Sequence, residues 1–568
     1  MKKSLFTLFA IGLAFGVSAQ WTADPLLVFP EESSLYVHEM KTGPGGTTYF
    51  LIDHPAGADE YDFENVKYDF RLQAYDKEGN KLFDGEYGKL ISNYPNRSYT
   101  VCNDYLMVDR DDNAIVSVAD CRNSADGSQM SYTIYKISPT GEMLWGEDGV
   151  NVDDGIARDF NAHMSMAQLD DGSYVCAWQR SYGENNWAIE IMKLSADGRL
   201  LWNADETRMI SDATSYTYPY VVNAGDNQCI LVYAKGSNQE IYVRKLDIDG
   251  TNAWGEDTRV YRSGWGQIPL WTILDVKPSG DGGVIIGWND DREFTNVDSA
   301  YISYVKPDGK LGFLAASENG DVKLGYSEMR ALSVKVMELN GDFYAMWRET
   351  SSGQSWNSIR AQRISKSGEL LWDEEGVEVI PMTQVAFGYF NLTPAPDGNI
   401  ALFYMKNDNY TISCYVEPRN AETGERAFES DDIDGLPITD VLNPSAANLV
   451  AEPCPEHDFW AISWTEGYTD YSWYVQRLGY DYKTGPDMSG VKDIAADKKV
   501  ASFNYDGTSF NSANAGRLIV SNLAGAKMLE TNISAFESLS WNAPAPGVYT
   551  ATLIPEKGKA ISIKLLCK

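Results

Sequence analysis

A glycine-centred turn recurs along most of this chain at nearly even spacing, and this feature constrains the fold most. Glycine readily adopts the positive φ that tight hairpins need. Neighbouring copies stand 52 to 62 residues apart, at Gly79, Gly141, Gly198, Gly250, Gly309, Gly368, Gly424 and Gly485. A period of this length is typical of architectures assembled from copies of one supersecondary unit.

The clearest copy runs from His163 to Trp202 and indicates what the unit is. Its apolar residues alternate or cluster in four short runs, at 164–169, 174–178, 188–194 and 200–202. An Asp-Asp-Gly turn separates the first two runs, and an Ala-Asp-Gly turn separates the last two. Short apolar runs joined by such turns predict a four-stranded antiparallel meander.

Two phrases that end in tryptophan mark several of the copies. The first is Gly-x-x-x-Trp, which ends at Trp145, Trp202, Trp254 and Trp372. The second is an apolar strand that closes on Trp178, Trp288, Trp347 and Trp464. In the first and seventh copies, Phe83 and Phe428 stand where the first phrase would have tryptophan. The repetition predicts that the copies share one fold and stack on their neighbours.

A single four-stranded sheet leaves both of its faces uncovered, and a ring of stacked sheets covers them. Helical patterns are absent, so we predict an all-β fold, with an eight-bladed β-propeller over residues 20–485. Seven blades are the alternative if the first or last copy only completes a neighbour by strand exchange. An open solenoid is the rival architecture. Residues 486–568 carry further short apolar runs, which predict a small C-terminal β-sandwich.

The N-terminal residues have the pattern of a targeting segment. Lys2 and Lys3 precede an apolar run of 13 residues, from 5 to 17, and Val17-Ser18-Ala19 offers small residues at the cleavage positions. Such a run is too short to cross a bilayer. Residues 1–19 are therefore predicted to be a secretory signal peptide. This predicts a secreted protein, at the extracellular or outer-membrane surface or in the periplasm.

The charge of the chain narrows the choice of partners. The formal net charge is −34 at pH 7, which disfavours binding to nucleic acid or anionic lipid. Only four histidines occur and no Cys-x-x-Cys pair exists, so we predict no zinc site and no cofactor. Calcium is the weak alternative, at the acidic loops Asp109, Asp111, Asp112 and Asp431, Asp432, Asp434. The second loop has Val441 where a calcium loop would have glutamate.

The tail resembles the C-terminal sorting domain (Por) of proteins exported by the type IX secretion system. Residues 516–527 match its strand–turn–strand, 545–550 match its "PGxY" strand, and 559–564 match its basic final strand. The ending Leu565-Leu566-Cys567-Lys568 departs from the usual finish. The resemblance implies the export machinery as a partner, and removal or anchoring of the tail at the surface.

The repeats resemble the tryptophan-rich propeller repeats that are often found before such a domain. Residues 281–292 (DGGVIIGWNDDR) and 141–150 (GEMLWGEDGV) match the phrases of that family. This resemblance implies fold and export, and no activity. Quinone-binding propellers share Gly-x-x-x-Trp but carry an adjacent cysteine pair, which is absent here. The sialidase motif resembles residues 195–202 with a different spacing.

Five tryptophans are candidate ligand-binding residues. Trp187, Trp356 and Trp473 each follow a repeat tryptophan by nine residues, at the junction between the second-to-third loop and the third strand. Trp265 and Trp271 lie in a connector expected on the same face. Exposed indole rings could stack on sugars or on aromatic residues. The alternative is that each ring packs on its own blade.

These observations predict a surface binding module for glycan or protein. A glycoside hydrolase or lyase on the same scaffold is the alternative, and a structural component of a cell-surface assembly is a third. No catalytic motif stands out, so catalytic residues stay unassigned. The oligomeric state is also left open.

Overall fold

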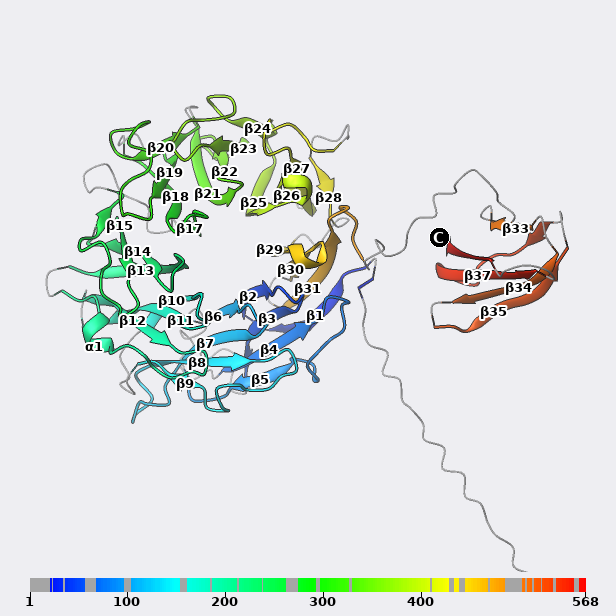
Figure 1. Ribbon diagram of the computed structural model, residues 1–568, viewed down its shortest axis with the longest axis horizontal. Helices are drawn as coiled ribbons and strands as arrows, with labels where there is room; N and C mark the ends of the chain where they lie inside the picture. The colour runs from blue at the N-terminus through cyan, green and yellow to red at the C-terminus, as the bar shows by residue number, and fades with distance from the viewer. Residues whose placement is uncertain are drawn as a thin grey trace, which may run out of the picture. The chain divides into compact units, whose positions relative to one another are not determined.

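The computed structural model confirms the all-β propeller prediction and divides into two compact units between Pro486 and Asp487 (Figure 1). The structure describes residues 21–567 except 23, 34–35, 57–67, 97–103, 154–160, 184–185, 212–213, 238, 262–273, 293–296, 326–328, 409–410, 429–433, 439–444, 468–469, 486–502, 506–507, 513–514, 523, 535–537 and 556–560. The predicted signal peptide therefore lies outside the described residues.

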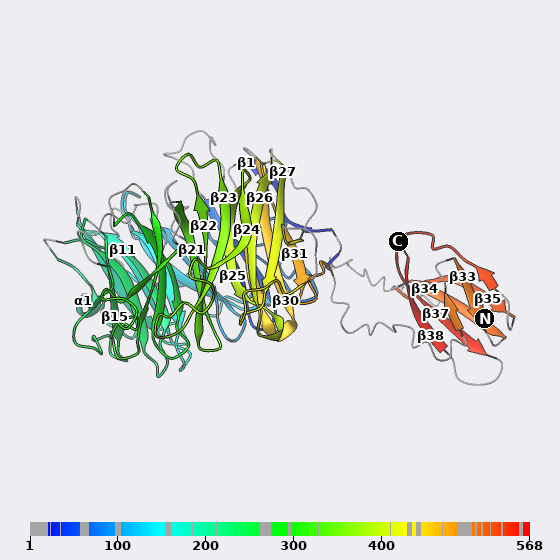
Figure 2. The ribbon, with the colours of Figure 1, turned by 90° about the horizontal axis from the view of Figure 1, so that it is seen from above.

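The described residues of the first unit form eight antiparallel sheets, which we number 1 to 8 by the chain order of their first strands. Each first strand contacts the first strands of the two neighbouring sheets, and sheet 8 contacts sheet 1, so the circle is closed. Figures 1 and 2 show these sheets standing around one axis. The first strands are β2 (Tyr36–Thr42), β6 (Tyr105–Val108), β10 (Asn161–Gln168), β13 (Tyr216–Asn223), β17 (Asp275–Pro278), β21 (Arg330–Leu339), β25 (Ala386–Pro394) and β29 (Ala447–Cys454).

The other strands follow in chain order outward from the axis. Second strands are β3 (Thr48–Pro55), β7 (Ala114–Asp120), β11 (Tyr174–Ser181), β14 (Cys229–Lys235), β18 (Val284–Asp290), β22 (Asp342–Thr350), β26 (Ile400–Asp408) and β30 (Phe459–Glu466). Third strands are β4 (Tyr68–Tyr75), β8 (Ser131–Ile137), β12 (Trp187–Leu194), β15 (Glu240–Leu246), β19 (Ser299–Val305), β23 (Asn357–Ile364), β27 (Thr411–Arg419) and β31 (Asp470–Gly479). Fourth strands are β5 (Lys89–Ser92), β9 (Val150–Asn151), β16 (Thr258–Arg259), β20 (Asp321–Leu324), β24 (Val377–Thr383) and β28 (Leu436–Pro437).

The ring closes through an exchanged strand. In sheet 8 the fourth position belongs to β1 (Leu26–Ser33), from the other end of the chain, which pairs antiparallel with β31. In sheet 3 that position holds an isolated bridge between Ile189 and Met209, and the short helix α1 (Ala204–Thr207) precedes it. Strand exchange thus occurs at the seam between sheets 8 and 1, through a segment that precedes the first repeat, while the first and last repeats each form a sheet.

A hydrophobic core fills each of the eight gaps between neighbouring sheets, as stacking of half-buried sheets requires. The strand-end tryptophans Trp178, Trp288, Trp347 and Trp464 are fully buried in these cores. Each packs on the sheet that precedes its own. The second tryptophan phrase therefore marks side chains of the hydrophobic core.

The hairpin tryptophans reach the sheet that follows. All eight indexed glycines have positive φ. A side chain at Gly198 would meet the ring of Trp145, because the tryptophan of one sheet lies on the hairpin glycine of the next. The indole N–H of Trp145 also donates to the carbonyl of Ala196, at 3.1 Å. At the seam, Trp21 takes the same role against Gly79 and donates to Lys77 O at 2.8 Å.

The first strands share an irregularity that the sequence does not signal. In five of them a β-bulge contains a non-glycine residue with positive φ, namely His163, Tyr218, Ser333, Tyr389 and Asn448. Bulges re-aim side chains and are common near functional sites. The rings of His163 and Tyr218, from neighbouring sheets, have centroids 4.6 Å apart. Desolvation lowers the pKa of His163, so its neutral form is favoured.

The second unit contains two antiparallel sheets. One has β32 (Phe503–Tyr505), β33 (Ser509–Ser512) and β36 (Ser538–Ser540), and the other has β35 (Lys527–Ile533), β34 (Gly516–Asn522), β37 (Gly547–Pro555) and β38 (Ile561–Cys567). One core joins them through side chains such as Phe510, Leu518 and Trp541. The unit is thus a small two-sheet sandwich. Among the residues described, no helix combines the length and apolar character needed to cross a membrane.

Candidate functional site

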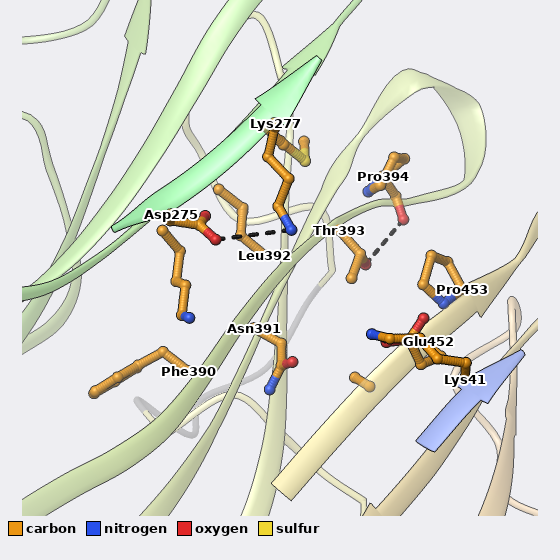
Figure 3. A pocket seen from close by; sticks show the side chains of 13 residues that line it. Lys41, Asp275, Lys277, Phe390, Asn391, Leu392, Thr393, Pro394, Glu452 and Pro453 are labelled. Atoms are coloured by element: carbon orange, nitrogen blue, oxygen red, sulfur yellow. Dashed lines mark hydrogen bonds and ion pairs between the residues drawn. The ribbon is translucent and has the colours of Figure 1, made fainter. Parts of the chain in front are cut away.

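A cavity of about 300 Å³ lies among the first strands of five sheets. Sheets 5, 6, 7, 8 and 1 all contribute to its wall, through β17, β21, β25, β29 and β2 (Figure 3). We call this cavity the axial pocket. Its volume is at the lower end of the range for small-molecule sites. Since five sheets build it, the ring has to be closed before the pocket exists.

The axial pocket lies toward the edge of the sheets that carries the turns between first and second strands. In sheet 6, Arg330 is level with Thr350 and Asn357 at one edge, whereas Leu339 pairs with Asp342 at the other. The pocket-lining residues of this sheet lie in the second half of β21. The second-to-third loops, where ligand contacts were predicted, are at the opposite edge.

Three lysines and two carboxylates give the pocket a charged wall. Lys41 Nζ lies 2.7 Å from Glu452 Oε1, and this ion pair joins sheet 1 to sheet 8 across the seam. The Glu452 charge raises the pKa of Lys41. Lys277 Nζ lies 3.7 Å from Asp275 Oδ1, which is beyond hydrogen-bond distance. Within the described residues, the Lys335 ammonium has no hydrogen-bond or ion-pair partner.

Carboxylates of the first strands also hold neighbouring sheets together. Asp275 Oδ2 accepts from the backbone N–H of Val336, at 2.7 Å. Glu39 Oε2 accepts from the backbone N–H of Leu106, at 2.8 Å. Burial raises the pKa of Glu39 to about 8, against the opposing effect of Lys41. At neutral pH the Glu39 carboxyl is therefore mostly uncharged.

Neutral polar groups and apolar side chains complete the lining. The side-chain amide of Asn391 donates to Leu449 O at 3.2 Å and to Tyr389 O at 3.4 Å. These contacts leave the Asn391 carbonyl oxygen without a donor among the described residues. Thr393 accepts from the indole N–H of Trp460 and donates to its neighbour Pro394 (Figure 3). Phe390, Leu392 and Met337 supply the apolar surface.

Of the five predicted tryptophans, the three that the structure describes differ in their exposure. Trp356 is 44% exposed beside the start of β23, and Trp187 is partly buried at the start of β12. Trp473 is only 2% exposed, because it packs against Phe29 and Phe50 in the core at the seam. Its ring faces other aromatic rings and is not presented to a ligand. Trp265 and Trp271 lie outside the described residues.

The first predicted acidic loop links sheet 2 to both of its neighbours. Asp109 is 1% exposed and accepts from Asn113 and Tyr174, with Lys136 Nζ at 3.0 Å. Asp112 accepts from the backbone N–H of Gly45, in the neighbouring sheet. In the second loop, Asp431 and Asp432 lie outside the described residues. No group of three or more potential metal ligands occurs among the residues that the structure describes.

Sequence reasoning missed the pocket lysines and Asn391. One signal was present, since 275–278 (DVKP) places charges at alternate positions of a first strand, and 333–339 (SVKVMEL) places Lys335 between valines of another, where a packed strand would be apolar. Charges there indicate that the strand borders a polar space. The grouping itself needs the closed ring, because Lys41 and Glu452 are 411 residues apart.

No protein-family model and no curated protein matches the chain. Several solved structures do. A polysaccharide lyase described as a PL25 ulvan lyase is 11% identical, with 70% of this chain and 97% of that one covered, at a TM-score of 0.40. The Dos1 propeller is 9% identical, covering 80% and 95%, at 0.38. An endo-arabinase from Bacteroides thetaiotaomicron VPI-5482 is 13% identical, covering 45% and 92%, at 0.26. At such identities the likeness concerns the fold alone.

Proposed function

We propose that the propeller is a binding module that takes a carbohydrate into the axial pocket. The observation that carries this proposal is the lining, in which hydrogen-bonding groups that have no partner among the described residues stand beside apolar side chains. A sugar ring offers hydroxyl groups to the first kind of surface and C–H faces to the second. A cavity of about 300 Å³ limits the bound portion to a short stretch of a chain.

The setting of the protein fits an extracellular ligand. The pattern of residues 1–19 supports secretion, and the resemblance of residues 486–568 supports sorting to the outer-membrane surface. The formal charge of −34 disfavours nucleic acid as the ligand. The alternative ligand is a protein partner. The exposed ring of Trp356 would be a contact for it.

A surface glycoside hydrolase or lyase is the second candidate, and Glu39 is the residue that favours it. A carboxyl that keeps its proton at neutral pH has the property of a general acid. However, Glu39 is bound to the Leu106 backbone, Asp275 accepts from the Val336 backbone, and Glu452 is ion-paired with Lys41. We therefore rank binding above catalysis.

Titration calorimetry on the mature chain with a panel of oligosaccharides tests the proposal. Asn391→Leu should weaken binding about tenfold, since it removes the free acceptor of the pocket. Trp356→Ala should leave the affinity unchanged, because this ring lies at the opposite edge of the sheet. The reverse pattern would move the site to the loop face. If no oligosaccharide binds the parent chain, the proposal fails, and release of reducing ends would favour the enzyme.

A further inference from the structure

The three lysines of the axial pocket are not equivalent. Lys41 is committed to Glu452 by a 2.7 Å ion pair. Lys277 has only a 3.7 Å contact with Asp275 (Figure 3). Lys335 has no acceptor within the described part of the chain. Among the described residues, the ammonium group of Lys335 thus has no acceptor, and that of Lys277 has only a distant one.

The charge balance of the wall is opposite to that of the protein. Three ammonium groups face the carboxylates of Asp275 and Glu452, which leaves a formal excess of one positive charge. The protein as a whole carries −34. An unpaired ammonium group in a partly enclosed site is costly unless an anion or ordered water compensates it.

The contacts that Asp275 makes do not remove this excess positive charge. One of its oxygens accepts from Val336 N at 2.7 Å, which ties β17 to the strand that carries Lys335. Its other oxygen lies toward Lys277. Asp275 therefore acts as a positioning residue, since it holds the two lysine-bearing strands side by side at the pocket wall.

We infer that Lys277 and Lys335 form a subsite for an anionic substituent of the bound sugar, a carboxylate or a sulfate ester. This inference rests on the proposed function and names the ligand class. Charge-assisted hydrogen bonds from two ammonium groups suit an anion with several oxygens. The free oxygen of Asn391 accepts from a neighbouring sugar hydroxyl, and Leu392 and Met337 contact the C–H face. The ligand is thus an acidic glycan.

The overall charge also sets a preference among acidic glycans. A surface of −34 repels a densely charged polyanion, and the repulsion is strong at low ionic strength. A single anionic group in a pocket with one excess positive charge is favoured instead. We therefore expect a glycan with sparse charges to bind more tightly than one with a charge on every ring.

Calorimetry on the mature chain with three matched probes tests this inference. The probes are a uronate-containing oligosaccharide, the same oligosaccharide with its carboxyl groups reduced to alcohols, and a sulfated oligosaccharide of equal length. The uronate or the sulfated probe should bind at least tenfold more tightly than the reduced probe. Which of the two anionic probes binds more tightly identifies the substituent.

Variants assign the effect to the two lysines. Lys277→Met and Lys335→Met should each weaken binding of the anionic probe about tenfold and should weaken binding of the reduced probe much less. Lys335→Arg should retain most of the affinity. Lys310→Met is the matched control, because Lys310 is 76% exposed on a hairpin and its loss changes the net charge equally. Thermal unfolding shows that each variant is folded.

The outcomes separate the inference from the proposed function. Equal affinity for the anionic and reduced probes would overturn the inference and keep the carbohydrate site. Loss of affinity in Lys310→Met as large as in Lys335→Met would also overturn it, since the effect would be one of net charge. Binding of a glutamate-rich peptide through Lys335, with no sugar bound, would overturn both, as would no binding of any probe.

Discussion

The axial wall of the ring has two unlike halves. At two register-equivalent positions of the first strands, sheets 5, 6, 8 and 1 carry six ionisable residues, Asp275, Lys277, Lys335, Glu452, Glu39 and Lys41. Sheets 2, 3 and 4 carry Tyr105, Met107, Ser165, Ala167, Tyr220 and Val222 at the same positions. We call these the charged arc and the apolar arc. The backbone repeats around the ring, so side chains alone make one arc a candidate site.

The largest effect should come from placing a lysine of the charged arc at the equivalent position of the apolar arc. Val222 is 8% exposed and occupies the position that Lys277 has in sheet 5. Val222→Lys should destabilise the propeller by about 3–5 kcal/mol, because an unpaired ammonium group would be buried. Urea unfolding followed by tryptophan fluorescence measures this. Lys277→Met is the reciprocal control, with an expected change below about 1 kcal/mol. Equal effects would show that the arcs do not differ.

The next effect concerns the seam, which the charged arc contains and the apolar arc does not. Trp21 is 3% exposed and fixes the exchanged N-terminal segment to the hairpin of sheet 1. Trp21→Ala should cost about 2–4 kcal/mol in the free energy of unfolding. It should also weaken ligand binding, since Lys41 and Glu452 meet across this seam. Calorimetric unfolding and binding are the measurements. Normal binding by a destabilised variant would show that the pocket does not depend on the seam.

The third effect depends on pH and concerns Glu39 in the charged arc. The pKa of Glu39 is raised from 4.5 to about 8, so the folded state holds a proton that the unfolded state has lost between these values. The stability that Glu39 contributes should therefore fall as the pH rises from 4.5 to 8. Glu39→Gln removes this dependence and keeps an acceptor for Leu106 N. At pH 9 the variant should be more stable by about 1–3 kcal/mol, and at pH 4 the two should agree. A difference that does not change with pH would contradict the burial of this carboxyl.

The smallest effect is expected at the loop edge, away from both arcs. Trp356 is 44% exposed, and Trp356→Ala should change the free energy of unfolding by less than about 0.5 kcal/mol. Thermal unfolding of the variant beside the parent is sufficient to test this. A larger loss would mean that this ring packs on its own sheet as a structural element.

The repeat could be predicted from sequence because its signals are local. Glycine at the hairpins and tryptophan at the strand ends report turns and cores within a few residues, so the ring architecture followed. The bulges could not be predicted, since Tyr218 and Tyr389 are bulky residues, which seldom take a positive φ. Trp473 looked like Trp356 in the repeat, and it is buried because Phe29 of the exchanged strand and Phe50 of sheet 1 pack against it at the seam.

The exchanged strand β1 has a consequence for biosynthesis. Its partner β31 lies about 440 residues later, and synthesis at roughly 5–20 residues per second separates the two by about 20–90 s. Throughout that time the first-made strand is an unpaired edge, which other chains can capture. Folding therefore requires that β1 does not pair with another chain before β31 has been synthesised, so a high local concentration of nascent chains should promote misassembly.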